Sequence, residues 1–185
     1  LIGYAGNNKD VLGLLDDYFK PQITREVNPV LIGSGEVATC FTPPSGCGTV
    51  IANLISKAQE SIYVQAYGFT SGEIAKALIN ASNRGVEVRV LLDKSNIGAK
   101  YSKMRDLRKA GIEVLIDEVS GIAHNKIIII DGSLVITGSF NFTISADIGN
   151  TENVIIVRDK QVAQRYLQNW FARYEISYAR ITKKQ

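Results

Sequence analysis

Short apolar runs of strand length alternate with longer segments of helical spacing from Glu36 onward. This alternation limits the fold most, because strands separated by helices pair into a sheet whose faces the helices cover. We therefore predict an α/β fold, a mixed β-sheet flanked by helices on both faces. The predicted strands are 36–41, 62–67, 86–92, 112–116, 123–130, 134–137 and 153–157, and the predicted helices are 49–60, 70–84, 98–110 and one after Asp159.

Local signals mark several of these boundaries. Thr70 and Glu73 fit a capping box that begins a helix, and Gly85 suits the left-handed conformation that ends it. The dipeptide Asp131-Gly132 favours a hairpin turn between two strands. In the last helix the apolar residues recur at helical spacing, and we assign them to the core: Val162, Tyr166, Leu167, Trp170, Phe171 and Tyr174.

The chain is long enough for one domain with a hydrophobic core and short for two. Of its 185 residues 45% are hydrophobic and 21% charged, values that exclude disordered and fibrous proteins. We expect residues 1–35 to be an N-terminal extension with a short helix over 9–19, and residues 36–185 to form the domain. No apolar run approaches the about 18 residues that a transmembrane helix needs.

Cys40 and Cys47 lie in a short segment whose Pro43, Pro44 and Gly46 favour a tight reversal. We expect a disulfide, which would place the protein in an oxidising compartment, and two unpaired thiols are the alternative. We therefore expect export to the periplasm or the medium. The chain begins with Leu1, so a signal peptide or membrane anchor before it is expected to have been lost. With two Cys and one His, a zinc site of about four ligands is not expected.

The segment His124-Asn125-Lys126 is the most informative for chemistry. Residues two apart on a strand point to the same side, so His124 and Lys126 project together while Asn125 faces the other way. An imidazole beside an ammonium can bind a phosphate and attack it. The four isoleucines at 127–130 predict that the strand behind them is buried.

Polar residues also follow the next strand. Ser139 and Asn141 are again two apart and can donate to phosphate oxygens, while Gly138 permits a close backbone approach. Each residue alone has an ordinary explanation: an interior histidine, a solvated lysine, the turn former Asp131, and loop polarity at Ser139 and Asn141.

Taken together, these residues resemble the signature of the phospholipase D superfamily at every specified position: His124-x-Lys126, four residues, Asp131, six residues, then Gly138-Ser139-x-Asn141. The segments 66–70, 91–93, 138–143 and 151–154 are similar to the small bacterial endonucleases of that superfamily, and 40–44 looks most like its rickettsial-type members. The resemblance covers about residues 36–175 and implies one motif per chain.

The resemblance also implies a mechanism. Double displacement at phosphorus needs a nucleophile and an acid, and imidazole can do either, yet the chain has one histidine. We therefore expect a symmetric homodimer, in which one His124 forms a phosphohistidine and the other acts as acid and then base. Lys126, Ser139 and Asn141 would hold the phosphoryl oxygens, and Glu152 would orient the nucleophilic ring. Asp131 is expected to be structural, and no metal or cofactor is expected.

The substrate is the least determined feature. We favour nucleic acid, DNA or RNA, chiefly because of the resemblance to the endonucleases; helix 98–110 is also basic, and its Lys103, Arg105 and Arg108 can contact phosphates. Phospholipid is the alternative, for which the amphipathic segment 11–19 is the one candidate membrane contact in the sequence. The net charge of +3 suits an anionic partner and an ordinary surface equally. A catalytically inactive relative that binds nucleic acid or membrane is a third possibility.

Overall fold

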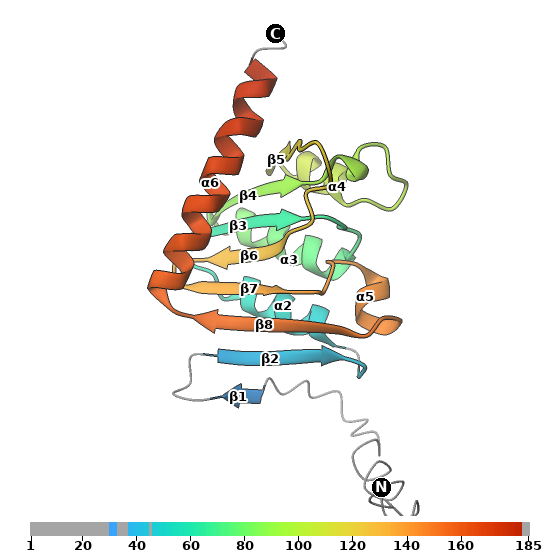
Figure 1. Ribbon diagram of the computed structural model, residues 1–185, viewed down its shortest axis with the longest axis vertical. Coiled ribbons are helices and arrows are strands. Elements are labelled where there is room, and N and C mark those ends of the chain that lie inside the picture. The colour runs from blue at the N-terminus through green and yellow to red at the C-terminus, as the bar shows by residue number, and fades with distance from the viewer. Residues whose placement is uncertain (1–29, 33–36, 45, 183–185) are drawn as a thin grey trace, which may run out of the picture.

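The computed structural model describes residues 30–32, 37–44 and 46–182. Its strands form one mixed sheet in the order β1-β2-β8-β7-β6-β3-β4-β5 (Figure 1). The strands are β1 (Val30–Ile32), β2 (Val37–Thr42), β3 (Ser61–Ala66), β4 (Glu87–Leu92), β5 (Glu113–Ile116), β6 (Lys126–Ile130), β7 (Leu134–Gly138) and β8 (Glu152–Arg158). The helices are α2 (Cys47–Ser56), α3 (Gly72–Asn83), α4 (Met104–Lys109), α5 (Ile144–Ile148) and α6 (Lys160–Thr182), with a 3-10 turn, η1 (Lys94–Asn96).

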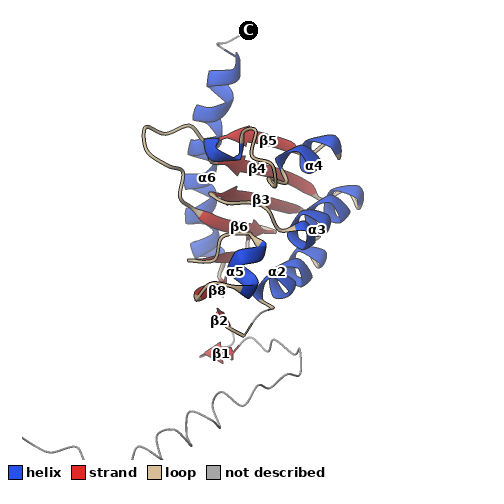
Figure 2. Cartoon of the chain, turned by 90° about the vertical axis from the view of Figure 1, so that its right-hand side faces the viewer, coloured by secondary structure: helices blue, strands red, loops and turns tan. Residues whose placement is uncertain are grey.

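Helices cover both faces of the sheet, which confirms the predicted fold class (Figure 2). The larger core lies between the sheet and α2 to α5, and the smaller one lies under α6. The side chains of β6 alternate between these cores, with Ile128 and Ile130 in the larger and Ile127 and Ile129 in the smaller. Trp170 of α6 is buried and donates from Nε1 to the Val64 carbonyl at 2.9 Å, so this aromatic helix face is core, as predicted.

The strand directions bring many strand ends to one edge of the sheet. β3, β4 and β5 are parallel, and β6 and β8 run the opposite way to their neighbours. The carboxyl ends of β2, β3, β4, β5 and β7 therefore lie beside the amino ends of β6 and β8. We call this the site edge; it lies to the right in Figure 1 and faces the viewer in Figure 2.

Three predicted boundaries at the site edge were wrong. α3 is capped by Ser71, whose Oγ accepts from the Ile74 N–H at 3.2 Å, and not by Thr70. The predicted helix 98–110 shrinks to α4, because Gly98 takes a left-handed φ of 71° and a turn precedes the helix. β6 begins at Lys126 instead of residue 123, since the Ala123 N–H donates to the Asp93 carboxylate rather than to a neighbouring strand.

The predicted boundary between extension and domain at residue 36 does not match the sheet. Val30–Ile32, assigned to the extension, pair with Val37–Thr39 as the antiparallel edge strand β1. The helix expected over 9–19 and the rest of 1–29 lie outside the described residues. None of the helices in the described part of the chain has the length and apolar character needed to cross a bilayer.

A disulfide joins Cys40 of β2 to Cys47 at the start of α2. The backbone N–H groups of Gly46 and Gly48 both donate to Oδ1 of Asp147 in α5, at 3.0 and 3.1 Å. The segment between β2 and α2 is therefore tied covalently to the sheet and by hydrogen bonds to α5.

Asp131 begins the turn between β6 and β7 and has a positive φ of 49°. Its carboxylate accepts from the backbone N–H groups of Gln59, Glu60 and Ser61, which lead from α2 into β3. Burial alone would raise the pKa of this carboxyl, but these donors hold it below its ordinary value. At about 3.3 Å per strand residue, Asp131 lies roughly 16 Å along β6 from Lys126, so it organises the fold far from the site edge.

We predict that Asp131→Ala lowers the free energy of unfolding at pH 7 by about 2–3 kcal/mol, because three backbone donors lose their acceptor. The stability that a depressed carboxyl pKa supplies is present above the unfolded value of about 3.9 and is lost as pH falls through the folded value. Urea unfolding at several pH values should therefore show the deficit of the variant shrinking below about pH 4. Asp131→Asn, which tolerates the positive φ, is the matched control for backbone strain, and a deficit independent of pH would contradict this explanation.

Candidate active site

His124 and Lys126 lie together at the site edge. His124 is exposed and precedes β6, whereas Lys126 is its first residue and only 7% exposed. The Lys126 Nζ donates to the His124 carbonyl at 2.7 Å. Burial lowers the pKa of Lys126 below its ordinary value, and the nearby Glu152 carboxylate partly offsets this. The pair therefore combines an accessible imidazole with a partly desolvated ammonium, which binds an anion more strongly than a solvated one does.

Tyr67 contacts both members of this pair, a role that the sequence analysis missed. Its ring centroid lies 4.9 Å from that of His124 and 5.3 Å from the Lys126 Nζ. The backbone joins the same groups, since the Tyr67 N–H donates to the Asn125 carbonyl at 3.0 Å. In the sequence, its position at the end of a predicted strand could have indicated that Tyr67 lies at the site edge.

Asn141 reaches the site edge from the segment after β7. That segment lies against residues 68–71, because the N–H groups of Thr70 and Ser71 both donate to the Phe142 carbonyl at 2.9 Å. A Cβ atom on Gly68 would lie 3.6 Å from the Asn141 Oδ1. This oxygen is buried and has no hydrogen-bond partner among the described residues. Asn141 is thus a polar side chain at the site edge with unused hydrogen-bonding capacity.

Ser139 is not free to donate to a substrate, in contrast to the expectation. Its hydroxyl donates to Oε2 of Glu152 and accepts from the Asn153 backbone N–H at 3.0 Å. Glu152 in turn accepts from the Asn150 amide at 2.9 Å. No hydrogen bond joins Glu152 to His124 among the described residues of the single chain, where Glu152 instead bonds Ser139 and Asn150, so the predicted ring-orienting contact is not seen there.

Gly138 fits the expected close backbone approach. Its φ is 145°, and a Cβ atom there would lie 2.3 Å from the Asn153 carbonyl oxygen. The same carbonyl accepts from the backbone N–H groups of Ser139 and Phe140. Any side chain at 138 would therefore force β7 and β8 apart beside Ser139.

A hydrogen-bonded chain supports this segment from the opposite face of the sheet. Asn125 donates to the Gln65 Oε1 at 3.0 Å, and Gln65 donates to the Asp117 Oδ2 at 2.7 Å. The other Asp117 oxygen accepts from Arg173 of α6, in an ion pair whose carboxylate is 2% exposed. His124-Asn125-Lys126 is therefore held from both faces of the sheet.

The three predicted substrate-binding cations differ in availability. Lys103 pairs with Asp106 at 3.2 Å, and Arg108 donates to the Val114 carbonyl at 2.7 Å, so both have partners within the chain. Arg105 is exposed and has no ion pair or hydrogen bond within the described ranges. The structure therefore does not assemble these residues into one basic helix face.

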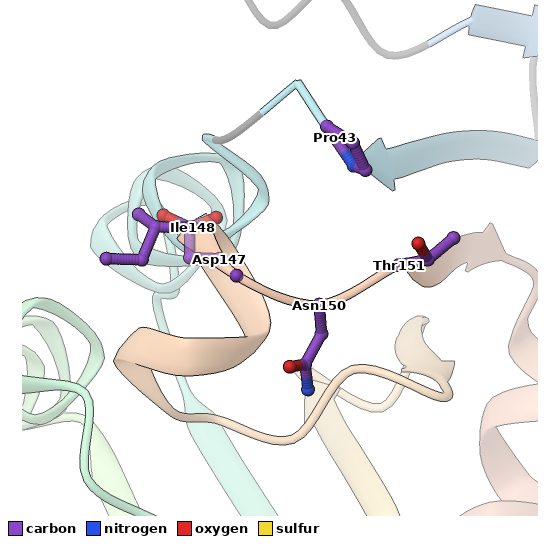
Figure 3. Close-up of a pocket in the computed structure, with 6 residues that line it drawn as sticks. Pro43, Asp147, Ile148, Asn150 and Thr151 are labelled. Atoms are coloured by element: carbon purple, nitrogen blue, oxygen red, sulfur yellow. The ribbon is translucent and has the colours of Figure 1, made fainter.

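A pocket of about 210 Å³ lies next to this constellation and is lined by Pro43, Asp147, Ile148, Gly149, Asn150 and Thr151 (Figure 3). It separates Pro43, after β2, from α5 and the loop that leads to β8. It reaches the site through Asn150, which binds Glu152, whereas His124 and Lys126 lie outside it. Among the described residues no three His, Cys, Asp or Glu side chains are grouped to hold a metal ion.

The comparisons with known proteins agree with this geometry. The family profile described as "Cardiolipin synthase, PLD-like domain" matches residues 51–174. A phospholipase D of Rickettsia conorii is 59% identical over 142 residues, which cover 77% of this chain and 71% of the relative. One from Rickettsia bellii is 49% identical over 174 residues, covering 94% and 87%.

One solved structure is similar to this chain in both fold and sequence. It is the phospholipase D family member Nuc from Salmonella typhimurium, with a TM-score of 0.71 and 32% identity, and the match covers 75% of this chain and 93% of that one. The chain therefore belongs to the phospholipase D superfamily as a single-motif member, and it is a phosphodiesterase of that superfamily of hydrolases.

Proposed function

We propose that the protein hydrolyses phosphodiesters through a phosphohistidine at His124, in a symmetric homodimer that needs no metal or cofactor. The observation that carries this proposal is the exposed His124 beside the buried Lys126, in a chain with no other histidine. One imidazole cannot be both nucleophile and acid in the same step. A second copy is the simplest source of the other.

In the first step a ring nitrogen of one His124 attacks phosphorus. A P–N bond forms, the bond to the leaving oxygen breaks, and the protonated His124 of the second copy gives its proton to that oxygen. In the second step this now neutral imidazole takes a proton from water, whose oxygen attacks phosphorus and breaks the P–N bond. The product is a phosphomonoester, and both rings return to their starting protonation states.

The remaining residues stabilise charge on the phosphoryl group. Lys126 supplies a poorly solvated cation, and the amide N–H groups of Asn141 can donate to non-bridging oxygens. We assign Ser139 and Glu152 a positioning role: together with Asn150 and Asn153 they fix the end of β7, and Glu152 helps to keep Lys126 protonated.

We propose phospholipid as the substrate, reversing the preference drawn from the sequence. Lys103 and Arg108, two of the cations that supported nucleic acid in addition to the resemblance to endonucleases, have partners within the chain. Exposed apolar side chains instead gather at the site edge, among them Ile122, two residues before His124. The name phospholipase D of the two rickettsial relatives also supports a lipid substrate.

Nucleic acid stays the second candidate, favoured by exposed cations at the same edge, such as Arg105 and Lys100. A panel of phosphatidylcholine vesicles, plasmid DNA, single-stranded DNA and RNA decides between them. Release of headgroup from lipid, with the nucleic acids intact, is the expected result. If His124→Ala matches wild type on every substrate, the protein is a binding module and the catalytic proposal fails.

We also propose that the protein is exported. The Cys40–Cys47 disulfide supports this, because such bonds persist in oxidising compartments and are rare in reducing ones. Thiol titration of protein taken directly from its native compartment is expected to find no free thiol without reductant.

We predict that a mixed dimer with a single His124 is nearly inactive, because the two subunits share one site. In a purified dimer of one wild-type and one His124→Ala subunit, each phosphoryl group meets one imidazole, so activity should fall by about 10³-fold or more. Two independent sites would instead leave about half of the activity. A mixed dimer of wild type with Glu175→Gln, an exposed α6 position, is the control and should retain full activity.

We predict an alkaline decline in rate that belongs to Lys126. On bis(4-nitrophenyl) phosphate, whose leaving group needs no proton, the acid imidazole no longer limits the alkaline side. Because burial lowers the pKa of Lys126, the decline in wild-type activity should occur at a pH below the ordinary lysine pKa of about 10.4. Lys126→Arg, with a permanent charge, should be slower but should lose this decline. The same decline in both proteins would exclude Lys126 as its source.

We predict that chelation leaves the rate unchanged. In this mechanism Lys126 and its copy neutralise the phosphoryl charge that a cation would otherwise cover. Activity on bis(4-nitrophenyl) phosphate after dialysis against excess EDTA should equal that before it. A loss on dialysis that added divalent cations restore would refute the metal-independent mechanism.

A further inference from the structure

Exposed apolar side chains are concentrated at the site edge. Of the eight exposed large hydrophobic residues in the described part of the chain, six lie on segments that end there: Phe41, Ile97, Tyr101, Ile122, Ile144 and Ile148. The two others, Ile176 and Tyr178, lie on α6. An apolar rim around one edge marks a surface that another molecule covers.

Ile97 and Tyr101 belong to residues 94–105, which comprise η1, the turns that follow it and the first two residues of α4; we call this segment the 94–105 loop. They are 59% and 71% exposed. In Figure 1 this loop runs outward from the sheet after β4, beside α4. An isoleucine and a tyrosine displayed on a projecting loop match the side chains that enter the boundary between water and acyl chains.

The 94–105 loop is anchored to the active-site segments. The Asn96 amide donates to the Tyr67 carbonyl at 2.7 Å, and the Lys103 N–H donates to the Phe69 carbonyl at 2.9 Å. Asp93 bonds the Ser95 N–H on one side and the Ala123 N–H, next to His124, on the other. The loop therefore has a fixed base beside Tyr67 and His124.

The positive charge of the 94–105 loop favours an anionic partner. From residue 94 to 105 there are three lysines and one arginine and no acidic residue. Lys103 is paired with Asp106, which leaves Lys94, Lys100 and Arg105 without an ion pair among the described residues. The proposed homodimer must cover part of the site edge near His124, but a twofold axis through this loop would bring its cations against those of the second copy. An anionic surface has no such conflict.

We infer that the 94–105 loop is a docking element for anionic phospholipid bilayers. Ile97 and Tyr101 insert at the interface, while Lys94, Lys100 and Arg105 contact lipid phosphates. This inference rests on the proposed function, because docking here places His124 and Lys126 over the membrane surface. It adds a lipid contact outside the catalytic site that discriminates by membrane charge.

The test measures binding and catalysis separately. Binding is followed by co-sedimentation with phosphatidylcholine vesicles, with and without phosphatidylglycerol, in a His124→Ala background so that the lipid is not consumed. Catalysis is followed on bis(4-nitrophenyl) phosphate, which presents no interface. The test variant is Ile97→Ser/Tyr101→Ser. The matched control is Ile176→Ser/Tyr178→Ser, which removes the same residue types from the exposed face of α6.

We expect Ile97→Ser/Tyr101→Ser to bind the anionic vesicles about tenfold more weakly or worse, to keep its rate on bis(4-nitrophenyl) phosphate and to remain dimeric. The control should bind like the parent. A second variant, Lys94→Gln/Lys100→Gln, should lose the preference for phosphatidylglycerol.

Four results would overturn the inference: unchanged vesicle binding in both loop variants, equal loss in the control, dissociation of the dimer, or weakened binding to plasmid DNA alone. Dissociation of the dimer would show that the loop binds the second copy, and weakened binding to plasmid DNA alone would show that it binds nucleic acid. If the wild type does not cleave bis(4-nitrophenyl) phosphate, the proposed catalysis fails, and the vesicle measurement still decides the docking role.

Discussion

The burial of β6 on both faces is the constraint on which the active site depends. Its isoleucines point alternately into the two cores, so a slip by one residue would bring Lys126 or Asp131 into a buried isoleucine position and turn every side chain of the strand to the other core. Lys126 is the first residue of this strand, so the packing of the strand also fixes the position of Lys126. A long side chain that is normally mobile in solvent is thereby held beside His124, with its ammonium partly removed from water.

Seven strand ends meet at one edge of the sheet, so residues that are far apart in the sequence lie close together there. Tyr67 follows β3, Asn141 follows β7, Glu152 begins β8, and His124 precedes β6. No single segment supplies the site, and each contributes one or two side chains. The same edge carries the apolar rim and the basic 94–105 loop, so the proposed reaction and the proposed docking face the same direction.

The sequence predicted the fold well because apolar periodicity and turn residues are local signals. The strands β2 to β8, the hairpin at Asp131-Gly132 and the aromatic core face of α6 all followed from them, whereas β1 was missed. The errors arose where distant residues decide. Ser71 and Thr70 are neighbouring hydroxyls, and only the structure shows that Ser71 is the one that accepts from the Ile74 N–H. The start of β6 depends on Asp93, and the partners of Glu152 depend on Asn150 and Ser139, none of which periodicity can report.

The polar chain from Asn125 through Gln65 and Asp117 to Arg173 has a consequence for how the molecule tolerates change. It crosses from the reacting edge to α6, the helix that faces away from the other four. Since Asp117 is almost fully buried, losing Arg173 would leave an unpaired negative charge near the strand that begins at Lys126. Arg173 of α6 therefore supports, through Asp117, Gln65 and Asn125, the sheet edge that carries His124 and Lys126, and its substitution is expected to disturb that edge.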